Sequence, residues 1–304
     1  MKEYGRNIRT MFLLEVGRFN WKKYERVIVL SPHLDDAALS CGGLLTAIKG
    51  KVSRLVVTIA CGNPAPNPLD SCSEARKKPR ARKGHASPTQ RRGEDVDAMH
   101  SIDCDFVHLG FEDAIYRRSP TSGNLIYRSA RSKWSIPSRE DAGYIEELYF
   151  VLKRLCQNMG RVLIVSPLGV GFHVDHTICA QVALRLATSP LDILFYEDFP
   201  YIFDSAVGSG MNDDPFSAME RLGVTPEKRM AVPYDVTAKA RLLIRYRSQF
   251  PMLFENEKGM LDGLNSRLHK GVPTEILWDT EIPDLSEENR SSTPSDNSSG
   301  EENE

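Results

Sequence analysis

Short aliphatic runs alternate with longer segments whose apolar residues recur at helical spacing. The aliphatic runs have few polar interruptions, which is typical of strands buried on both faces of a parallel sheet. We expect strands at residues 26–30, 53–60, 106–110, 161–166, 193–196 and 276–278, and helices at 37–48, 90–99, 145–156, 173–186 and 236–250. This alternation predicts a single α/β domain with a Rossmann-like, mostly parallel sheet covered by helices on both faces.

Breaks in this pattern suggest how the chain is divided. A chain of 304 residues can hold one domain of up to about 250 residues with extensions. We expect an N-terminal extension at 1–23 and one domain at 24–283. A proline-rich, basic loop is inserted at 63–89, and the acidic segment 284–304 has the composition of a disordered tail.

Charge and cysteine content exclude several classes of protein. The net charge of −2 provides no overall attraction to nucleic acid, and no apolar run is long enough to span a membrane. The six cysteines form no CxxC pair, so neither a zinc ribbon nor a disulfide framework is indicated. The first residues lack the apolar run of a secretory signal. We therefore expect a cytoplasmic protein.

Polar residues gather where the first expected strand ends. The segment Ser31-Pro32-His33-Leu34-Asp35-Asp36 follows that strand and precedes a helix that Asp35 or Asp36 could cap. An imidazole and two carboxylates therefore lie at the carboxyl end of a strand, where open α/β sheets bind their ligands.

A second polar segment, His173-Val174-Asp175-His176, follows the strand at 161–166 and opens the next helix. A metal-dependent hydrolase needs about three protein ligands, an open position for water and a nearby base. His33, Asp36 and His176 could supply the ligands, and Asp35 could face the water. Asp175 could orient one of the imidazoles. Either segment alone could be a helix cap with a surface histidine, but together they favour a metal site.

These two segments resemble the motifs of the PIG-L/LmbE family of zinc-dependent N-deacetylases. Pro32-His33-Leu34-Asp35-Asp36 is similar to the first family motif, and His173-Val174-Asp175-His176 to the second. The resemblance extends over roughly residues 24–255 and includes supporting matches at 91–94, 109–113, 239 and 246–249.

The resemblance implies a single Zn²⁺ held by His33, Asp36 and His176. It also implies that Asp35 is the general base acting on water at the metal. His173, aided by Asp175, would stabilise the tetrahedral oxyanion and protonate the leaving amine.

Arg91 and Asp113 would hold the hydroxyls of a sugar, by the same resemblance. The substrate would then be an amino sugar or an N-acetylglucosaminyl conjugate. From the residues alone, Arg91 could instead pair with Glu94 on a solvated helix face.

The chain departs from the family pattern at a few places. Leu34 and Val174 occupy positions that are usually proline, and the region before the second motif contains Phe172 where several members have a tyrosine. The insertion at 63–89 would lie beside the sugar pocket, so the substrate could differ from simple conjugates.

Several alternatives stay open at this point. Two histidines and one carboxylate can also hold Fe²⁺. The substrate could be a non-sugar amide or a thiol conjugate, and a metal-binding relative without catalysis would use the same ligands. The oligomeric state, including a homo-oligomer, is not determined by the sequence.

Overall fold

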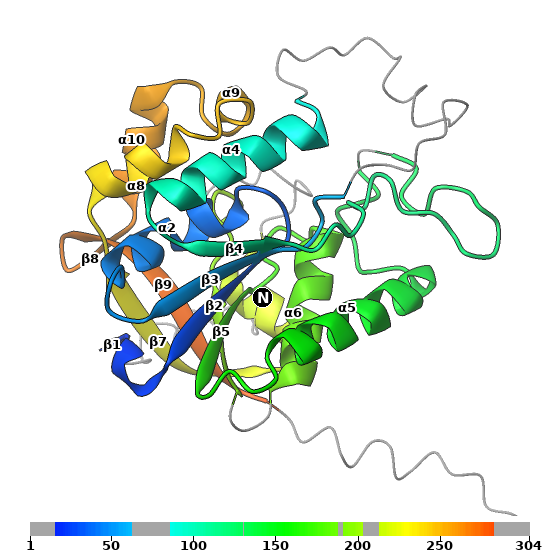
Figure 1. Ribbon diagram of the computed structural model, residues 1–304, viewed down its shortest axis with the longest axis horizontal. Helices are drawn as coiled ribbons and strands as arrows, with labels where there is room; N and C mark the ends of the chain where they lie inside the picture. The colour runs from blue at the N-terminus through cyan, green and yellow to red at the C-terminus, as the bar shows by residue number, and fades with distance from the viewer. Residues whose placement is uncertain (1–15, 63–85, 130, 188–190, 203–212, 283–304) are drawn as a thin grey trace, which may run out of the picture.

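One mixed sheet forms the centre of the molecule (Figure 1). The computed structural model describes residues 16–62, 86–129, 131–187, 191–202 and 213–282. Within these residues the strand order is β1-β7-β9-β6-β5-β2-β3-β4, and β8 pairs with β9. The strands are β1 Val16–Arg18, β2 Arg26–Ser31, β3 Ser53–Thr58, β4 Asp105–His108, β5 Val162–Pro167, β6 Leu191–Tyr196, β7 Thr225–Pro233, β8 Leu268–His269 and β9 Val272–Glu281.

The parallel half of the sheet contains β6, β5, β2, β3 and β4. From β2 the chain first proceeds outward to β3 and β4, and then returns to the other side of β2 for β5 and β6. The strand order therefore reverses between β2 and β5. In open α/β sheets this reversal creates the crevice in which ligands bind. The prediction of a Rossmann-like, mostly parallel sheet is confirmed.

The other half of the sheet contains antiparallel pairs that the sequence did not predict. β9 runs antiparallel to both β6 and β7, and it extends well beyond the expected strand at 276–278. β7 lies where the apolar pattern is weak, because several of its side chains are exposed. β1 falls within the predicted N-terminal extension and pairs parallel with β7.

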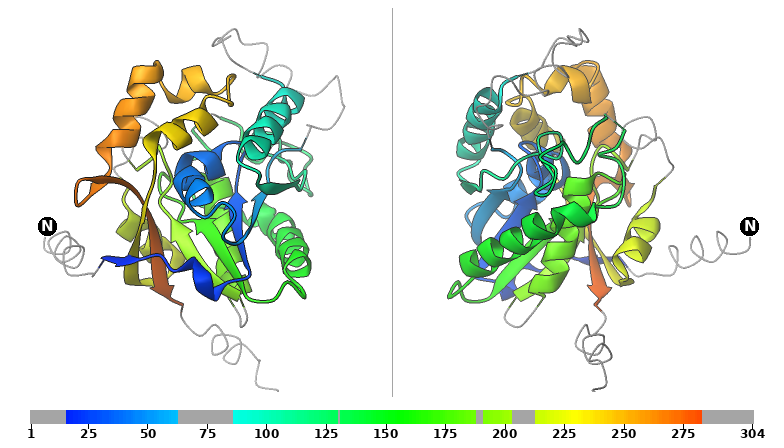
Figure 2. Two further views of the ribbon diagram at one scale, coloured as in Figure 1. Left: turned by 60° about the vertical axis from the view of Figure 1, so that its left-hand side comes forward. Right: turned by 90° about the vertical axis from the view of Figure 1, so that its right-hand side faces the viewer.

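Helices cover both faces of the sheet (Figure 2). One layer contains α2 Asp36–Ala47, α4 Pro88–Ser101, α8 Val236–Leu243 and α10 Glu257–Ser266, with the short α9 Phe250–Leu253. The other contains α5 Ala142–Leu155, α6 Val174–Leu186 and α7 Pro215–Leu222. Two short 3-10 helices, η1 Trp21–Lys23 and η2 Arg139–Asp141, precede β2 and α5. Each layer packs its own apolar cluster against the sheet.

The expected helix at 236–250 is wrong in its length, because the chain leaves the helix after Leu243. Glu94 of α4 accepts hydrogen bonds from the Ser248 backbone N–H and hydroxyl, at 3.0 and 2.7 Å. Tyr246 donates from its hydroxyl to Asp95 at 2.7 Å. These contacts hold residues 244–249 in a turn against α4, and they depend on partners far away in the sequence.

Glycine lets α2 approach the segment that leads into α8. A Cβ atom added to Gly43 would lie 2.5 Å from the Tyr234 Cβ, and one added to Gly42 would lie 3.1 Å from Leu242 Cδ2. Gly42 and Gly43 therefore allow α2 to pack closely against α8 and Tyr234.

Two predicted segments are only partly within the described residues, or lie outside them. Most of the basic insertion at 63–89 and all of the tail at 284–304 fall outside, and α4 already begins at Pro88. Over the part of the chain that is described, no helix is long and apolar enough to cross a membrane.

Candidate metal centre and catalytic site

The turn between β2 and α2 presents the Asp35 carboxylate without using it as a helix cap. Asp35 has a φ of 133°, an uncommon conformation for a residue with a side chain, and its carboxylate makes no capping hydrogen bond. Ser31 takes the capping role, since its hydroxyl accepts from the Ala37 N–H at 2.9 Å. Asp36 accepts from the His33 N–H at 2.8 Å, which closes the turn. Asp35 is therefore free for another role.

The turn between β5 and α6 places the second motif at the same edge of the sheet. Gly169 and Gly171 have φ values of 82° and 91°, which only glycine adopts readily. His173 then caps α6, because its Nδ1 accepts from the Asp175 N–H at 3.2 Å. The proton of a neutral His173 ring is therefore on Nε2.

Two imidazole nitrogens and one carboxylate oxygen converge between the motifs. His33 Nδ1 lies 3.3 Å from Asp36 Oδ2, and His176 Nε2 lies 3.2 Å from the same oxygen. The remaining ring nitrogens are already engaged, since His33 Nε2 lies 2.9 Å from Asp175 Oδ2 and His176 Nδ1 lies 2.6 Å from Asp198 Oδ1. His176 Nε2 is buried and has no hydrogen-bond partner among the described residues. The donor set fits Zn²⁺, and it also fits Fe²⁺.

Two other sets of donors lie close enough to hold an ion, namely His33, His173 and His176, and His33, Asp113 and Asp175. His173 has already committed Nδ1 to the Asp175 backbone, and the Asp175 carboxylate is bound by Arg117. Asp36 Oδ2, in contrast, faces both His33 Nδ1 and His176 Nε2 directly.

Asp198 is a site residue that the sequence analysis missed. It follows β6, and its second oxygen accepts from the Gly169 and Val170 N–H groups at 2.8 and 2.9 Å. The same carboxylate therefore fixes the ring of His176 and the loop that precedes it. Its position at the carboxyl end of a strand next to β5 was the available signal.

Asp175 connects the second motif to His33. Its Oδ2 faces His33 Nε2 and accepts from the Ala114 N–H at 3.1 Å, and its Oδ1 accepts from Arg117. Burial alone would raise the pKa of Asp175, but Arg117 and His33 hold that pKa well below its usual range. The carboxylate thus orients the ring of His33, whereas His173 is 3.9 Å away from it.

Arg117 is a second site residue that the sequence analysis missed, and no sequence pattern marks it. It lies in the irregular stretch before α5, is 3% exposed, and places Nε 2.9 Å from Asp141 Oδ1. Its guanidinium also lies over the rings of Tyr127 and Tyr144, at 5.3 and 4.5 Å. A buried guanidinium between two carboxylates holds Asp175 in the charged form.

Arg91 lies beside the carboxylate of Asp35. Arg91 Nη2 donates to the Leu34 carbonyl at 3.0 Å and lies 3.5 Å from Asp35 Oδ2. Burial raises the pKa of Asp35 to about 7, although Arg91 opposes the shift. The alternative pair between Arg91 and Glu94 is not formed, since Glu94 binds Ser248.

The remaining predicted residues surround this centre. Burial, together with His33, lowers the pKa of His173 well below its usual range, so the ring is neutral. Trp134 contacts the His173 ring edge-on at 4.8 Å. Asp113 is half-buried, with Oδ2 3.8 Å from His33 Nε2. Phe172 faces away toward Arg221, whose guanidinium lies 3.7 Å from the ring centre.

Comparison with known proteins decides the family. A family model described as PIG-L, GlcNAc-PI de-N-acetylase, matches residues 28–187, which is more than half of the chain. The chain belongs to the PIG-L family. The match contains both motifs, so the PIG-L resemblance drawn from the motif residues is confirmed.

Two relatives of this chain share one name with each other. The chain is 28% identical over 230 residues to 2′-N-acetylparomamine deacetylase of Streptomyces fradiae, covering 74% of this chain and 73% of the relative. It is also 28% identical over 185 residues to an enzyme of the same name from Niallia circulans, covering 57% and 66%. Both relatives are named deacetylases.

A solved structure shares the fold. The zinc-inhibited form of teicoplanin deacetylase Orf2 superimposes with a TM-score of 0.65 at 22% identity, covering 86% of this chain and 100% of that one. The fold of this chain is therefore shared with that deacetylase over most of its length.

Proposed function

We propose that the chain is a metal-dependent hydrolase that removes an N-acetyl or other N-acyl group from an amino sugar in a small-molecule conjugate. The convergence of His33 Nδ1 and His176 Nε2 on Asp36 Oδ2 carries the proposal. Both histidines are held by buried carboxylates on their opposite nitrogens, which is the usual arrangement of histidine ligands in metal enzymes.

His33, Asp36 and His176 would hold the metal, which we propose to be Zn²⁺, with Fe²⁺ as the alternative. A divalent ion at this position supplies Lewis-acid chemistry, because it polarises a carbonyl and makes water more acidic. Asp198 and Asp175 keep the two rings oriented before the metal arrives.

Asp35 would act as the general base. Its carboxylate is not used as a helix cap, and it interacts electrostatically with Asp36 and His33, so it can accept the proton of the attacking water. The same carboxylate can return this proton to the departing amine nitrogen, which needs protonation to leave. Arg91 keeps Asp35 in place.

His173 would stabilise the oxyanion. Because Nδ1 accepts the Asp175 N–H, Nε2 carries the proton and can donate it in a hydrogen bond to the carbonyl oxygen. The sequence analysis also assigned protonation of the amine to His173. We now favour Asp35 for that step, since a neutral imidazole is a weak acid.

The substrate class follows from the family and from the rim of the site. Arg91 and Asp113 would bind sugar hydroxyls, and relatives named for N-acetylparomamine support an amino-sugar conjugate.

We also propose a cytoplasmic location. Five cysteines within the described residues are buried free thiols, which suits a reducing compartment.

The test is amine release from a panel of N-acetylglucosamine derivatives that are free, glycosidic, lipid-linked or antibiotic-linked. Zinc is supplied in one arm and a chelator in another. We expect chelator-sensitive release from one class. Asp35→Asn should retain the metal but lose about 100-fold or more of turnover, within the usual contribution of a general base. Full turnover by this variant would refute the role of Asp35.

Two other functions would give different results. An amidase for a non-sugar or thiol-conjugate substrate would release no amine from the sugar panel but would hydrolyse simple N-acyl amines or thiol conjugates. A metal-binding relative without catalysis would bind stoichiometric metal and hydrolyse none of them.

A further inference from the structure

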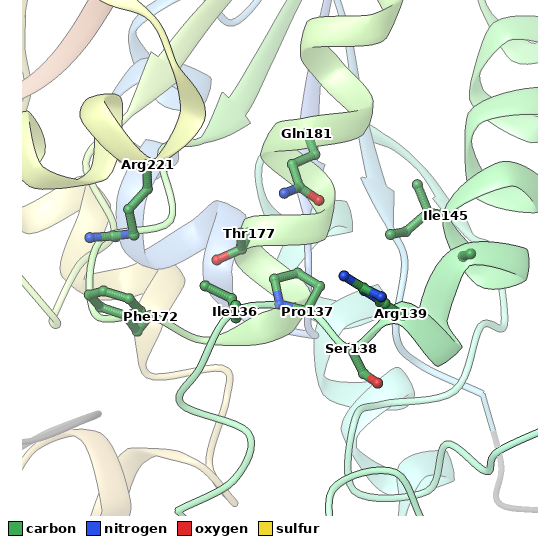
Figure 3. A pocket seen from close by; sticks show the side chains of 10 residues that line it. Ile136, Pro137, Ser138, Arg139, Ile145, Phe172, Thr177, Gln181 and Arg221 are labelled. Carbon is green, nitrogen blue, oxygen red and sulfur yellow. The ribbon is translucent and has the colours of Figure 1, made fainter. Parts of the chain in front are cut away.

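A cavity of about 370 Å³ lies beside α6 (Figure 3). Its walls come from α6, from the start of α5, from residues 136–139 and from Phe172 beside Arg221. None of the proposed metal ligands, nor Asp35, lines it. Its volume is within the range of small-molecule sites.

Two polar side chains of α6, Thr177 and Gln181, line this cavity. Thr177 and Gln181 are four residues apart, so they lie on one face of the helix, and Figure 3 shows them one above the other. Thr177 is 7% exposed. Within the described part of the chain, neither its hydroxyl nor the Gln181 amide makes a hydrogen bond to another side chain. Both polar groups are therefore available to hydrogen-bond a ligand in the cavity.

The charges around the cavity favour an anion. Arg139 and Arg221 line it, and no acidic residue does. Arg221 is neutralised by Asp213 at 2.6 Å, whereas Arg139 forms no ion pair among the described residues. Arginine presents several N–H donors in a fork that matches a carboxylate.

The remaining wall is apolar. Ile136, Pro137, Ile145 and Phe172 line the cavity, and Ile136 is 71% exposed. An exposed isoleucine at the mouth of a cavity offers apolar surface to whatever enters. A ligand that contacts both the polar and the apolar wall of the cavity has an apolar body and one anionic group.

We propose that this cavity is a second binding site, which takes a small amphipathic carboxylate. Its carboxylate contacts Arg139, Thr177 and Gln181, and its alkyl or aryl part packs on Ile136 and Phe172. The site does not depend on the proposed deacetylase activity, because the two share no lining residue.

The site is nonetheless connected to the catalytic motif. The loop that ends in the cavity wall also pairs with the second motif, since the Val174 N–H donates to the Lys133 carbonyl at 2.9 Å and Trp134 contacts His173. A ligand in the cavity therefore touches the loop that supports His173.

Isothermal titration of the metal-loaded full chain with octanoate tests the proposal, with octan-1-ol and octylammonium as probes of the same length. We expect octanoate to bind at one site per chain and the other two to bind at least about tenfold more weakly. Arg139→Gln should weaken octanoate binding about fivefold to tenfold. Arg154→Gln removes the same charge from the far end of α5 and should leave binding unchanged.

A second readout locates the ligand. In isoleucine methyl spectra, octanoate should shift Ile136, while Ile244, exposed on the opposite helical layer, should not move. Gln181→Leu should weaken binding as Arg139→Gln does. If both variants bind octanoate as tightly as the unsubstituted chain, octanoate binds elsewhere, for example at the metal centre, and the proposal is overturned. No binding at millimolar concentration would also overturn it, as would equal binding of octylammonium.

Discussion

His33 Nε2 lies 2.9 Å from Asp175 Oδ2, although the two residues are 142 positions apart in the chain. This contact joins the two motifs at the carboxyl ends of the neighbouring strands β2 and β5. It also commits one nitrogen of His33, so that only Nδ1 remains to face Asp36. The proposed ligand set therefore depends on Asp175, which is not itself a proposed ligand.

Asp175→Asn should weaken metal binding, because the amide cannot hold the His33 ring as the carboxylate does. We expect affinity to fall about 10- to 100-fold, as is usual for partners of histidine ligands. Competition with a chelating dye measures the metal affinity of the variant and of the unsubstituted protein. Asp262→Asn, an exposed acid of α10, is the control. Unchanged affinity in Asp175→Asn would show that His33 needs no such support.

Arg117→Gln should lower the free energy of unfolding by about 3 to 5 kcal/mol, because two buried carboxylates, Asp175 and Asp141, would lose their common cation. Arg185→Gln removes an arginine whose partner Glu146 is half-exposed, and should cost at most about 1 kcal/mol. Urea unfolding measures both. Equal losses would contradict the account of Arg117.

Gly43→Ala should destabilise the protein by about 1 to 3 kcal/mol, because the added Cβ would overlap Tyr234. Gly143→Ala is the matched substitution in α5, where an added Cβ meets nothing within 4 Å. It should stabilise the helix by about 0.5 to 1 kcal/mol. Opposite shifts in melting temperature are the expected result, and a shift of the same sign would argue against the packing of α2 on Tyr234.

Removal of the metal should lower the melting temperature, because an ion that binds only the folded chain stabilises it. At a free metal concentration 100 times the dissociation constant, the gain is about 2.7 kcal/mol. Melting curves with zinc and with chelator measure the difference. Asp36→Asn should lose most of this difference, and a variant that keeps it would exclude Asp36 as a ligand.

Local sequence patterns were sufficient to predict much of the fold and of the candidate site. The buried strands, the helix starts and both motifs follow from patterns a few residues long, because burial on both faces and turn chemistry are local properties. The order of the parallel strands then brings the motifs to one edge of the sheet. His33, Asp35, Asp36, His173 and His176 could therefore be singled out before the structure.

Contacts between distant segments decided the rest. Asp198 and Arg117 have no motif around them, and only the packed sheet shows that they hold His176 and Asp175. The end of α8 at Leu243 depends on Glu94 and Asp95 of α4, and the antiparallel half of the sheet depends on pairing with β9. The sequence by itself determined which residues could do the chemistry. The tertiary structure alone decided their partners, because hydrogen bonds across packed elements have no signature in the residues nearby.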